Sequence, residues 1–482
     1  MGIILFVIIT RFINDHTFFM EYTLAIDFGT TNSTVYLQRK GKKEQLWNNE
    51  VTGEYLFPSY VAYRKDEIVT GYAAKRLYGM DRQFVVSCVK RLIGLTYESY
   101  LKLEKKDIFG CEVVCGDDGY PYFVVSADGR KVSCIDVACE LFKWIKRSAE
   151  TVAEHEFTHA YVTRPANFRE NQVTAIRDAA RKAGLIIDKM ISEPSAAAIS
   201  WCFKEDGRIF SKLRRYSTVL VIDFGGGTLD LSIVRYLGTS QFRVIDSAGD
   251  PNLGGNDIDA ALQEYVLEKI RKMGHTIDKN DRRSKRMLRM LKKSCEEFKI
   301  LFNSKLRDAD DEDDFFRLNR NAVGDLDISY FGFDEQEISI TAREFYEALK
   351  EPLERYLVPL NKITRKPEQM VGSIRNVLLV GGSSLLKFLR LKLMSKGFIS
   401  KQFQDVDAMH CVSEGAFQLL SLYTNPHPRE SWMETLPSSY GLQSGDDEVC
   451  LMLLKGSTVP CCSEERNFTN LEDYPEYIYS KV

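Results

Sequence analysis

The stretch Val-Ile-Asp-Phe-Gly-Gly-Gly-Thr-Leu-Asp, residues 221–230, organises the interpretation of the whole chain. Residues 218–224 are β-branched or apolar apart from one aspartate, and this pattern predicts a buried strand. Three consecutive glycines then predict a tight turn, and residues 229–234 predict the returning strand. We therefore expect a β-hairpin that holds a ligand at its tip.

The tip of this hairpin has the chemistry of a phosphate site. Glycines allow backbone N–H groups to approach an anion closely, and the hydroxyl of Thr228 adds a donor. Asp223 and Asp230 carry negative charges that a cation would balance. Phosphate with a divalent metal ion is the ligand that this combination favours. The three glycines are Gly225, Gly226 and Gly227.

A second stretch repeats the pattern. Residues 24–32 contain a strand that ends in Asp27-Phe28-Gly29 and a short turn with hydroxyl groups, and a returning strand follows at 34–37. One glycine-rich turn is a weak signal, because most such turns only reverse the chain. Two matching hairpins indicate a duplicated fold whose halves face each other across a nucleotide.

Composition narrows the class of protein. The 482 residues correspond to about three domain-sized units, and 44% hydrophobic with 28% charged residues is typical of a soluble globular protein. A net charge of −3 disfavours a main role in nucleic-acid binding. Eleven scattered cysteines suit a reducing compartment better than a disulfide framework.

The amino terminus begins with an apolar run at residues 2–10, which is far short of the ~20 residues that span a bilayer. No basic residue precedes this run and no small-residue cleavage site follows it. We expect residues 1–19 to be an upstream extension of a cytoplasmic protein that begins at Met20. The alternative is a signal peptide that directs the chain to the lumen of the endoplasmic reticulum.

A third glycine-rich loop follows a buried strand predicted at residues 376–380. Gly381, Gly382 and Ser383 come directly after it and precede a predicted helix. Such a loop lets a flat ring lie on the backbone or places phosphate at a helix amino end.

Charged residues at two further positions are not explained by the pattern of a glycine-rich phosphate loop. Lys90 and Arg91 lie in the otherwise apolar segment 89–94, and the local pattern alone favours side chains that lie along a domain surface with their charged ends in water. Glu193 precedes a helix of small residues, whose close packing explains the alanines but not the glutamate.

Two other clusters are weaker candidates for metal binding. His155 and His159 are four residues apart but run into a predicted strand, and no constellation of carboxylates follows them. The acidic run 308–314 lacks the glycine turn and terminal glutamate of a calcium loop, so we expect an exposed loop there.

Taken together, these segments resemble the nucleotide-binding domain of the 70-kDa heat-shock (DnaK-like) chaperones. The resemblance covers residues 22–424 and implies an α/β actin-like ATPase fold, in which two lobes with duplicated mixed sheets close on Mg-ATP. The matching segments, in chain order, are 27–32, 58–61, 89–94, 193–194, 223–230, 253–255 and 381–383.

The resemblance also implies a role for individual residues. Lys90 positions or activates the attacking water, Asp230 is its polar partner, and Thr228 and Glu193 complete the catalytic set. Magnesium is held largely through water by Asp27, Asp223 and Glu193. The phosphates are cradled by Gly29, Thr30, Thr31, Asn32, Gly225, Gly226, Gly227 and Thr228. The nucleoside is bound by Glu296, Lys299, Ile300, Asn303, Gly381, Gly382, Ser383 and Leu385.

The chain departs from the family at three places. Two arginines that sandwich the adenine in the family are replaced by Ile300 and Leu385, which lose the cation–π share of the stacking energy, ~0.5–2 kcal/mol. Val173 stands where the family has an arginine that relays nucleotide state. The family's leucine-and-aspartate linker is absent from 425–439.

The resemblance divides the chain into an extension (1–19), a nucleotide-binding domain (20–424), a linker (425–437) and a β-rich remnant of the client-binding domain (438–482). Within the ATPase domain we expect lobe I at 20–210, lobe II at 211–405 and a closing helix at 406–424. Residues 438–482 are too few for a complete client-binding sandwich and its lid. We expect this tail to dock on the ATPase body or to be disordered.

The leading hypothesis is a truncated, divergent chaperone-family ATPase with slow turnover, ATP/ADP and Mg2+ as cofactors, and a J-domain co-chaperone and a nucleotide-exchange factor as partners. Binding of unfolded clients is doubtful, and neither nucleic acid nor a membrane span is expected. The alternative is a non-hydrolysing module of the same fold that binds nucleotide or only partners. Phosphotransfer to a sugar is disfavoured, because 89–94 and 253–255 resemble the chaperone branch.

Overall fold

The computed structural model describes residues 22–424, with gaps at 41, 49–53, 79, 81–83, 104–105, 203–215, 239–240, 279–280 and 366–370, and four short strands beyond. The expected extension 1–19 and most of the expected linker and tail lie outside the described residues. Within the described part of the chain, no helix combines the length and apolar character needed to cross a membrane.

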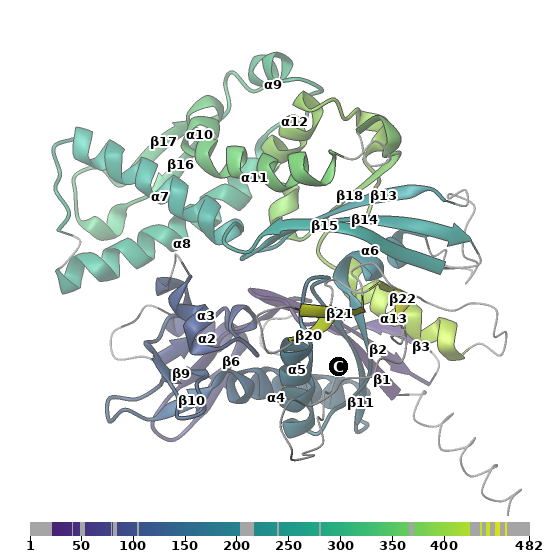
Figure 1. Ribbon diagram of the computed structural model, residues 1–482. Helices are drawn as coiled ribbons and strands as arrows, with labels where there is room; N and C mark the ends of the chain where they lie inside the picture. The colour runs from purple at the N-terminus through teal and green to yellow at the C-terminus, as the bar shows by residue number, and fades with distance from the viewer. Residues whose placement is uncertain are drawn as a thin grey trace, which may run out of the picture.

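A mixed sheet forms the centre of the lower lobe in Figure 1. Its strand order is β12-β11-β1-β2-β3, and the short strand β4 also pairs with β2. Strands β1 and β2 form the first predicted hairpin, and β11 runs parallel to β1. The bounds are β1 (Tyr22–Asp27), β2 (Asn32–Arg39), β3 (Lys42–Gln45), β4 (Phe57–Pro58), β11 (His159–Arg164) and β12 (Ile186–Ser192).

A second mixed sheet forms the lower face of the upper lobe, with the order β15-β14-β13-β18. Strands β13 and β14 form the second predicted hairpin, and β18 runs parallel to β13. Each lobe therefore has a central hairpin with a parallel strand on one side and an antiparallel strand on the other, which confirms the predicted duplication. The bounds are β13 (Thr218–Phe224), β14 (Leu229–Gly238), β15 (Gln241–Asp250) and β18 (Asn376–Val380).

The lower lobe is completed by two helices that pack on each other and by two small antiparallel sheets. A capping box between Ser133 and Asp136 begins the longer helix, and it satisfies backbone N–H groups that have no partner within the helix. These helices are α4 (Cys134–Ala153) and α5 (Glu170–Lys182). The small sheets and their helices are β5 (Val61–Tyr63), β6 (Ile68–Thr70), β7 (Phe84–Val86), β8 (Val113–Cys115), β9 (Pro121–Val124), β10 (Lys131–Ser133), α2 (Gly71–Leu77), α3 (Tyr97–Leu101), and the 3-10 turns η1 (Val89–Arg91) and η2 (Asp107–Phe109).

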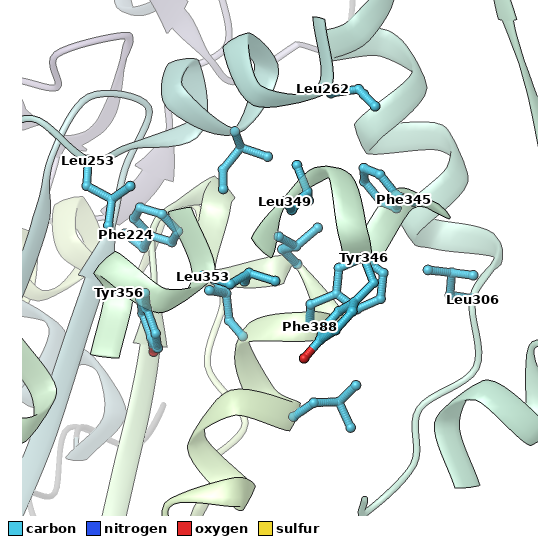
Figure 2. Packing of buried hydrophobic residues seen from close by; sticks show 14 of the residues in the cluster. Phe224, Leu253, Leu262, Leu306, Phe345, Tyr346, Leu349, Leu353, Tyr356 and Phe388 are labelled. Carbon is cyan, nitrogen blue, oxygen red and sulfur yellow. The ribbon is translucent and has the colours of Figure 1, made fainter. Parts of the chain in front are cut away.

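Helices cover the far side of the upper sheet and enclose a large apolar core. Figure 2 shows part of this core, which includes Leu349 and Leu353; here Phe388 lies against both Phe345 and Tyr346. The elements are α7 (Gly255–Lys272), α8 (Arg282–Lys305), α9 (Glu312–Leu318), α10 (Ala342–Ala348), α11 (Lys350–Ile363), α12 (Lys387–Ser395), β16 (Val323–Asp327), β17 (Glu337–Thr341), and the 3-10 turns η3 (Ser329–Phe331), η5 (Val371–Ser373), η6 (Gly382–Leu385) and η7 (Ser400–Gln402).

Two helices lie between the sheets, α6 (Glu193–Cys202) and α13 (Cys411–Thr424). They pack closely on each other, α6 against the upper sheet and α13 against the lower one. The buried alanines 196–198 of α6 explain this contact, because small side chains let helix backbones approach. The close packing expected of these alanines is therefore present.

The structure corrects one expectation about the acidic run 308–314. Asp311 caps the amino end of α9, and the next three acids form its first turn. Negative charge at a helix amino end is stabilised by the helix dipole, so this segment begins a helix and is not wholly a loop.

Beyond residue 424, the described strands pair in two short ladders: β19 (Glu434–Thr435) with β22 (Thr458–Val459), and β20 (Tyr440–Gln443) with β21 (Val449–Leu453).

Candidate functional site

The two hairpin tips meet at a cavity of about 480 Å³ between the lobes. Every hairpin-tip residue expected to contact phosphate lines it, and so do the three expected metal-shell carboxylates. From the first lobe these are Asp27, Gly29, Thr30, Thr31, Asn32 and Glu193. From the second lobe these are Asp223, Gly225, Gly226, Gly227 and Thr228.

The tips are in contact across the lobes. A Cβ atom built on Gly226 would lie 2.1 Å from Oγ1 of Thr31, and one on Gly227 would lie 2.8 Å from Cγ2 of Thr30. Backbone hydrogen bonds from 255 and 256 to the carbonyls of Gly225 and Gly226 hold the second tip in place. Glycine is therefore required here because of close approach between the lobes.

A buried ion pair lies beside the hairpin aspartates. Nζ of Lys90 donates a hydrogen bond to Oε1 of Glu193 at 2.6 Å, and the two residues are only 6% and 7% exposed. Lys90 belongs to η1, and Glu193 is the first residue of α6. The interpretation of Lys90 as a surface side chain with its charge in water is therefore wrong. The long-range contact with Glu193, from a different part of the chain, was not visible in the local pattern.

The charges in this cluster do not cancel. Burial raises the pKa of Asp27, and it raises the pKa of Glu193 to about 7 although Lys90 acts in the opposite direction. Burial and the charges of Glu193 and Asp27 raise the pKa of Asp223 well above its usual value. Burial also acts on Lys90, but the surrounding carboxylates outweigh it and raise the pKa of that lysine, which stays protonated.

This donor set fits a hydrated divalent cation. Glu193 is buried and Asp27, Asp223 and Asp230 are half-buried, so four carboxylates lie near the single ammonium of Lys90, and such an excess of negative charge partly removed from water is costly without a cation. Among the described residues, no group of three or more His, Cys, Asp or Glu side chains is arranged to hold a metal ion directly. A metal ion at this position would be held largely through water molecules.

The other end of the cavity is formed by α8 and the turn η6. Of the residues expected around the nucleoside, the lining includes Glu296, Lys299, Ile300, Gly381, Gly382, Ser383 and Leu385. Lys299 makes an ion pair with Asp259 at 2.7 Å, and Ser383 donates to the carbonyl of Gly225 at 2.9 Å.

Two residues expected at the site do not line the cavity. Asp230 is half-buried in β14 directly opposite Asp223 in the ladder, and a hydrogen bond from Thr228 acts against the rise of its pKa that loss of solvent causes. Asn303 is used inside the protein: its side-chain amide donates to the carbonyl of Leu385 at 2.9 Å and accepts from the backbone N–H of Lys387 at 3.0 Å. Its position supports the turn that carries Leu385.

Sequence reasoning missed several residues of the lining, among them Tyr72, Lys75, Asp259 and Met409. Lys75 forms an ion pair at 3.1 Å with Glu296, which joins α2 to α8 across the cavity. Tyr72 and Lys75 are three residues apart on α2, and this spacing places them on one face of the helix. Nothing in the local pattern indicates that this face borders the cavity.

The duplicated sheets, and the hairpins that meet at a cavity between the lobes, define the actin-like ATPase fold that was predicted. The family model described as "Hsp70 protein" matches residues 23–474, so the chain belongs to the Hsp70 family. It is similar to a chaperone protein DnaK from Psychrobacter cryohalolentis, with 28% identity over 464 residues. That match covers 94% of this chain but 66% of the relative, so the chain spans slightly less than two thirds of its length.

Proposed function

We propose that this chain binds Mg-ATP in the cavity between its lobes and hydrolyses it to ADP and phosphate. The observation that carries the proposal is the buried Lys90–Glu193 pair, placed beside two hairpin aspartates at the tips of two glycine turns. Membership of the Hsp70 family supports the same activity.

Each residue has a proposed role in positioning and charge stabilisation, which dominate phosphoryl transfer. The glycine turns and the hydroxyls of Thr30, Thr31 and Thr228 hold the phosphates. Magnesium bound through water by Asp27, Asp223 and Glu193 would offset the negative charge of the phosphates. Asp230 supports the second hairpin from β14.

Lys90 has a more restricted role than the resemblance alone allows. Nζ of Lys90 donates to Oε1 of Glu193 at 2.6 Å, and an ammonium group held by a carboxylate in this way is a hydrogen-bond donor without an acceptor site. We propose that its ammonium orients the attacking water and stabilises charge on the transferred phosphoryl group.

Replacement of Lys90 by alanine tests the proposal. We expect Lys90→Ala to bind ATP but to hydrolyse it about 10²–10³-fold more slowly, because a charged contact made in the transition state is lost. Single-turnover hydrolysis and equilibrium ATP binding measure the two effects separately. Lys102→Ala, which removes an exposed lysine on the same lobe, is the matched control.

Circular dichroism of the Lys90→Ala variant checks that it folds, because breaking a buried ion pair also destabilises a protein. Hydrolysis at close to the wild-type rate in a folded Lys90→Ala variant would contradict the assignment.

The second candidate is a module that binds nucleotide without hydrolysis, favoured by the aliphatic residues Ile300 and Leu385 at the nucleoside end. Single-turnover hydrolysis with and without a J-domain protein separates the two. Stimulated turnover supports the ATPase and the proposed co-chaperone partnership, whereas nucleotide binding without turnover in both conditions supports the module. A nucleotide-exchange factor is the second proposed partner, and the cytoplasm remains the expected location.

A further inference from the structure

Two aliphatic side chains stand exposed at the mouth of the cavity. Ile300 on α8 is 59% exposed and Leu385 on η6 is 56% exposed, and both line the cavity. The hydrogen bond from Asn303 to the carbonyl of Leu385 ties the turn to the same helix that carries Ile300. Large apolar side chains this exposed gain from an apolar ligand surface placed against them.

The polar side chains at this end already have partners within the protein. Glu296 pairs with Lys75, and Ser383 donates to the carbonyl of Gly225. Lys299 pairs with Asp259 and also donates to the carbonyl of Gly255 at 3.3 Å.

The amide of Asn303, the residue that ties η6 to α8, donates one hydrogen bond to a backbone carbonyl and accepts one from a backbone N–H. A flat base against Ile300 and Leu385 would therefore meet apolar surface on its face and few uncommitted side-chain groups at its edge.

Purine bases have similar faces and differ in the hydrogen-bond groups on their edges. A site that contacts only apolar surface discriminates weakly between ligands of similar shape, whereas a site that hydrogen-bonds a ligand group rejects analogues without it by about 10⁴–10⁵-fold. The side chains at this end of the cavity correspond to the first kind of site.

We propose that the cavity binds purine nucleoside triphosphates with similar affinity whichever purine base they carry. Contacts at the phosphate end then provide most of the selectivity for nucleotides over other ligands. This inference rests on the proposed nucleotide binding and goes beyond it, because it names the substrates as ATP, GTP and ITP alike. Affinities for the three nucleotides are expected to agree within about tenfold.

Calorimetric titration of the whole chain with Mg2+ and the β,γ-imido analogues of ATP and GTP, together with tripolyphosphate, tests this inference. We expect the two analogues to bind with dissociation constants within about tenfold of each other, and tripolyphosphate to bind more weakly than both. Binding of the GTP analogue more than about 100-fold weaker than that of the ATP analogue would overturn the inference and leave the proposed function intact. No binding of any of the three ligands would overturn both.

Two variants and a matched control identify the surface responsible. Ile300→Ser and Leu385→Ser should each weaken the ATP and GTP analogues by a similar factor, roughly 5–10-fold, and leave tripolyphosphate binding unchanged. Leu301→Ser is the control, because Leu301 is the next residue on α8, is 63% exposed and is not part of the cavity lining. A loss of affinity confined to the ATP analogue would contradict the inference, because it would mean that these two side chains distinguish adenine from guanine.

Discussion

Single atoms at the hairpin tips determine how closely the lobes can approach. The α-carbon of Gly226 faces Thr31 of the other lobe at a distance that leaves no space for a methyl group. The buried Lys90–Glu193 pair lies in the same cavity, so the two hairpins and the proposed catalytic lysine depend on one closed geometry. At this scale, we expect the proposed phosphate binding to depend on contact between the lobes.

Gly226→Ala is expected to weaken binding of Mg-ADP by roughly tenfold or more, since overpacking of this kind costs about 1–3 kcal/mol. The added Cβ would lie 2.1 Å from Oγ1 of Thr31, so the hairpins must move apart. Equilibrium titration measures the effect. The double variant with Thr31→Ala removes the nearest clashing atom and should recover part of the lost affinity. Wild-type affinity for Mg-ADP in the Gly226→Ala single variant would contradict this prediction, because it would show that the hairpin tips can move apart without weakening nucleotide binding.

At the scale of elements, the contact between α6 and α13 joins the two sheets. Gly415 of α13 faces the backbone of α6, and a Cβ there would lie 1.8 Å from the carbonyl oxygen of Ala196. Backbone cannot rotate away as a flexible side chain can. The small residues of both helices are therefore required by the packing of elements far apart in the sequence.

Gly415→Ala should lower the free energy of unfolding by about 1–3 kcal/mol, because the two helices must separate to admit the methyl group. Chemical denaturation monitored by far-UV circular dichroism measures the change. Gly372→Ala serves as the control, since an added Cβ at Gly372 meets no atom within 4 Å. Equal stability of the two variants would contradict the proposed packing requirement.

At the scale of the whole molecule, the cavity is bridged on the nucleoside side by the Lys75–Glu296 ion pair. The two side chains come from α2 and α8, one in each lobe, and each is about a third exposed (31% and 33%). Partly exposed pairs contribute little energy, typically ~0.2–1 kcal/mol, but we expect this pair to open when a bound nucleotide leaves between the lobes.

Lys75→Ala is therefore expected to accelerate release of a fluorescent ADP analogue by up to about fivefold in low salt. The difference from wild type should shrink at ~1 M salt, where exposed charges are screened within about 3 Å. Stopped-flow measurement of nucleotide release checks both expectations. Lys102→Ala removes a lysine whose partner, Glu98, is on the same lobe, and should leave the rate unchanged. An acceleration that persists unchanged in high salt would exclude an electrostatic origin.

Local sequence determined the parts of this protein that depend on neighbouring residues. The alternation of apolar residues and the glycine turns predicted both hairpins and their duplication, because strand and turn preferences act over a few positions. The succession of motifs also predicted the Hsp70 family correctly.

Tertiary structure alone decided which distant groups meet. The sequence did not reveal that Lys90 is buried against Glu193, that Asn303 supports a turn instead of lining the cavity, or that Lys75 reaches across it. These contacts join positions from separate elements, and they form only when two sheets and the helices between them pack together. Hydrophobic packing of the lobes sets that arrangement, and no short-range pattern in the chain encodes it.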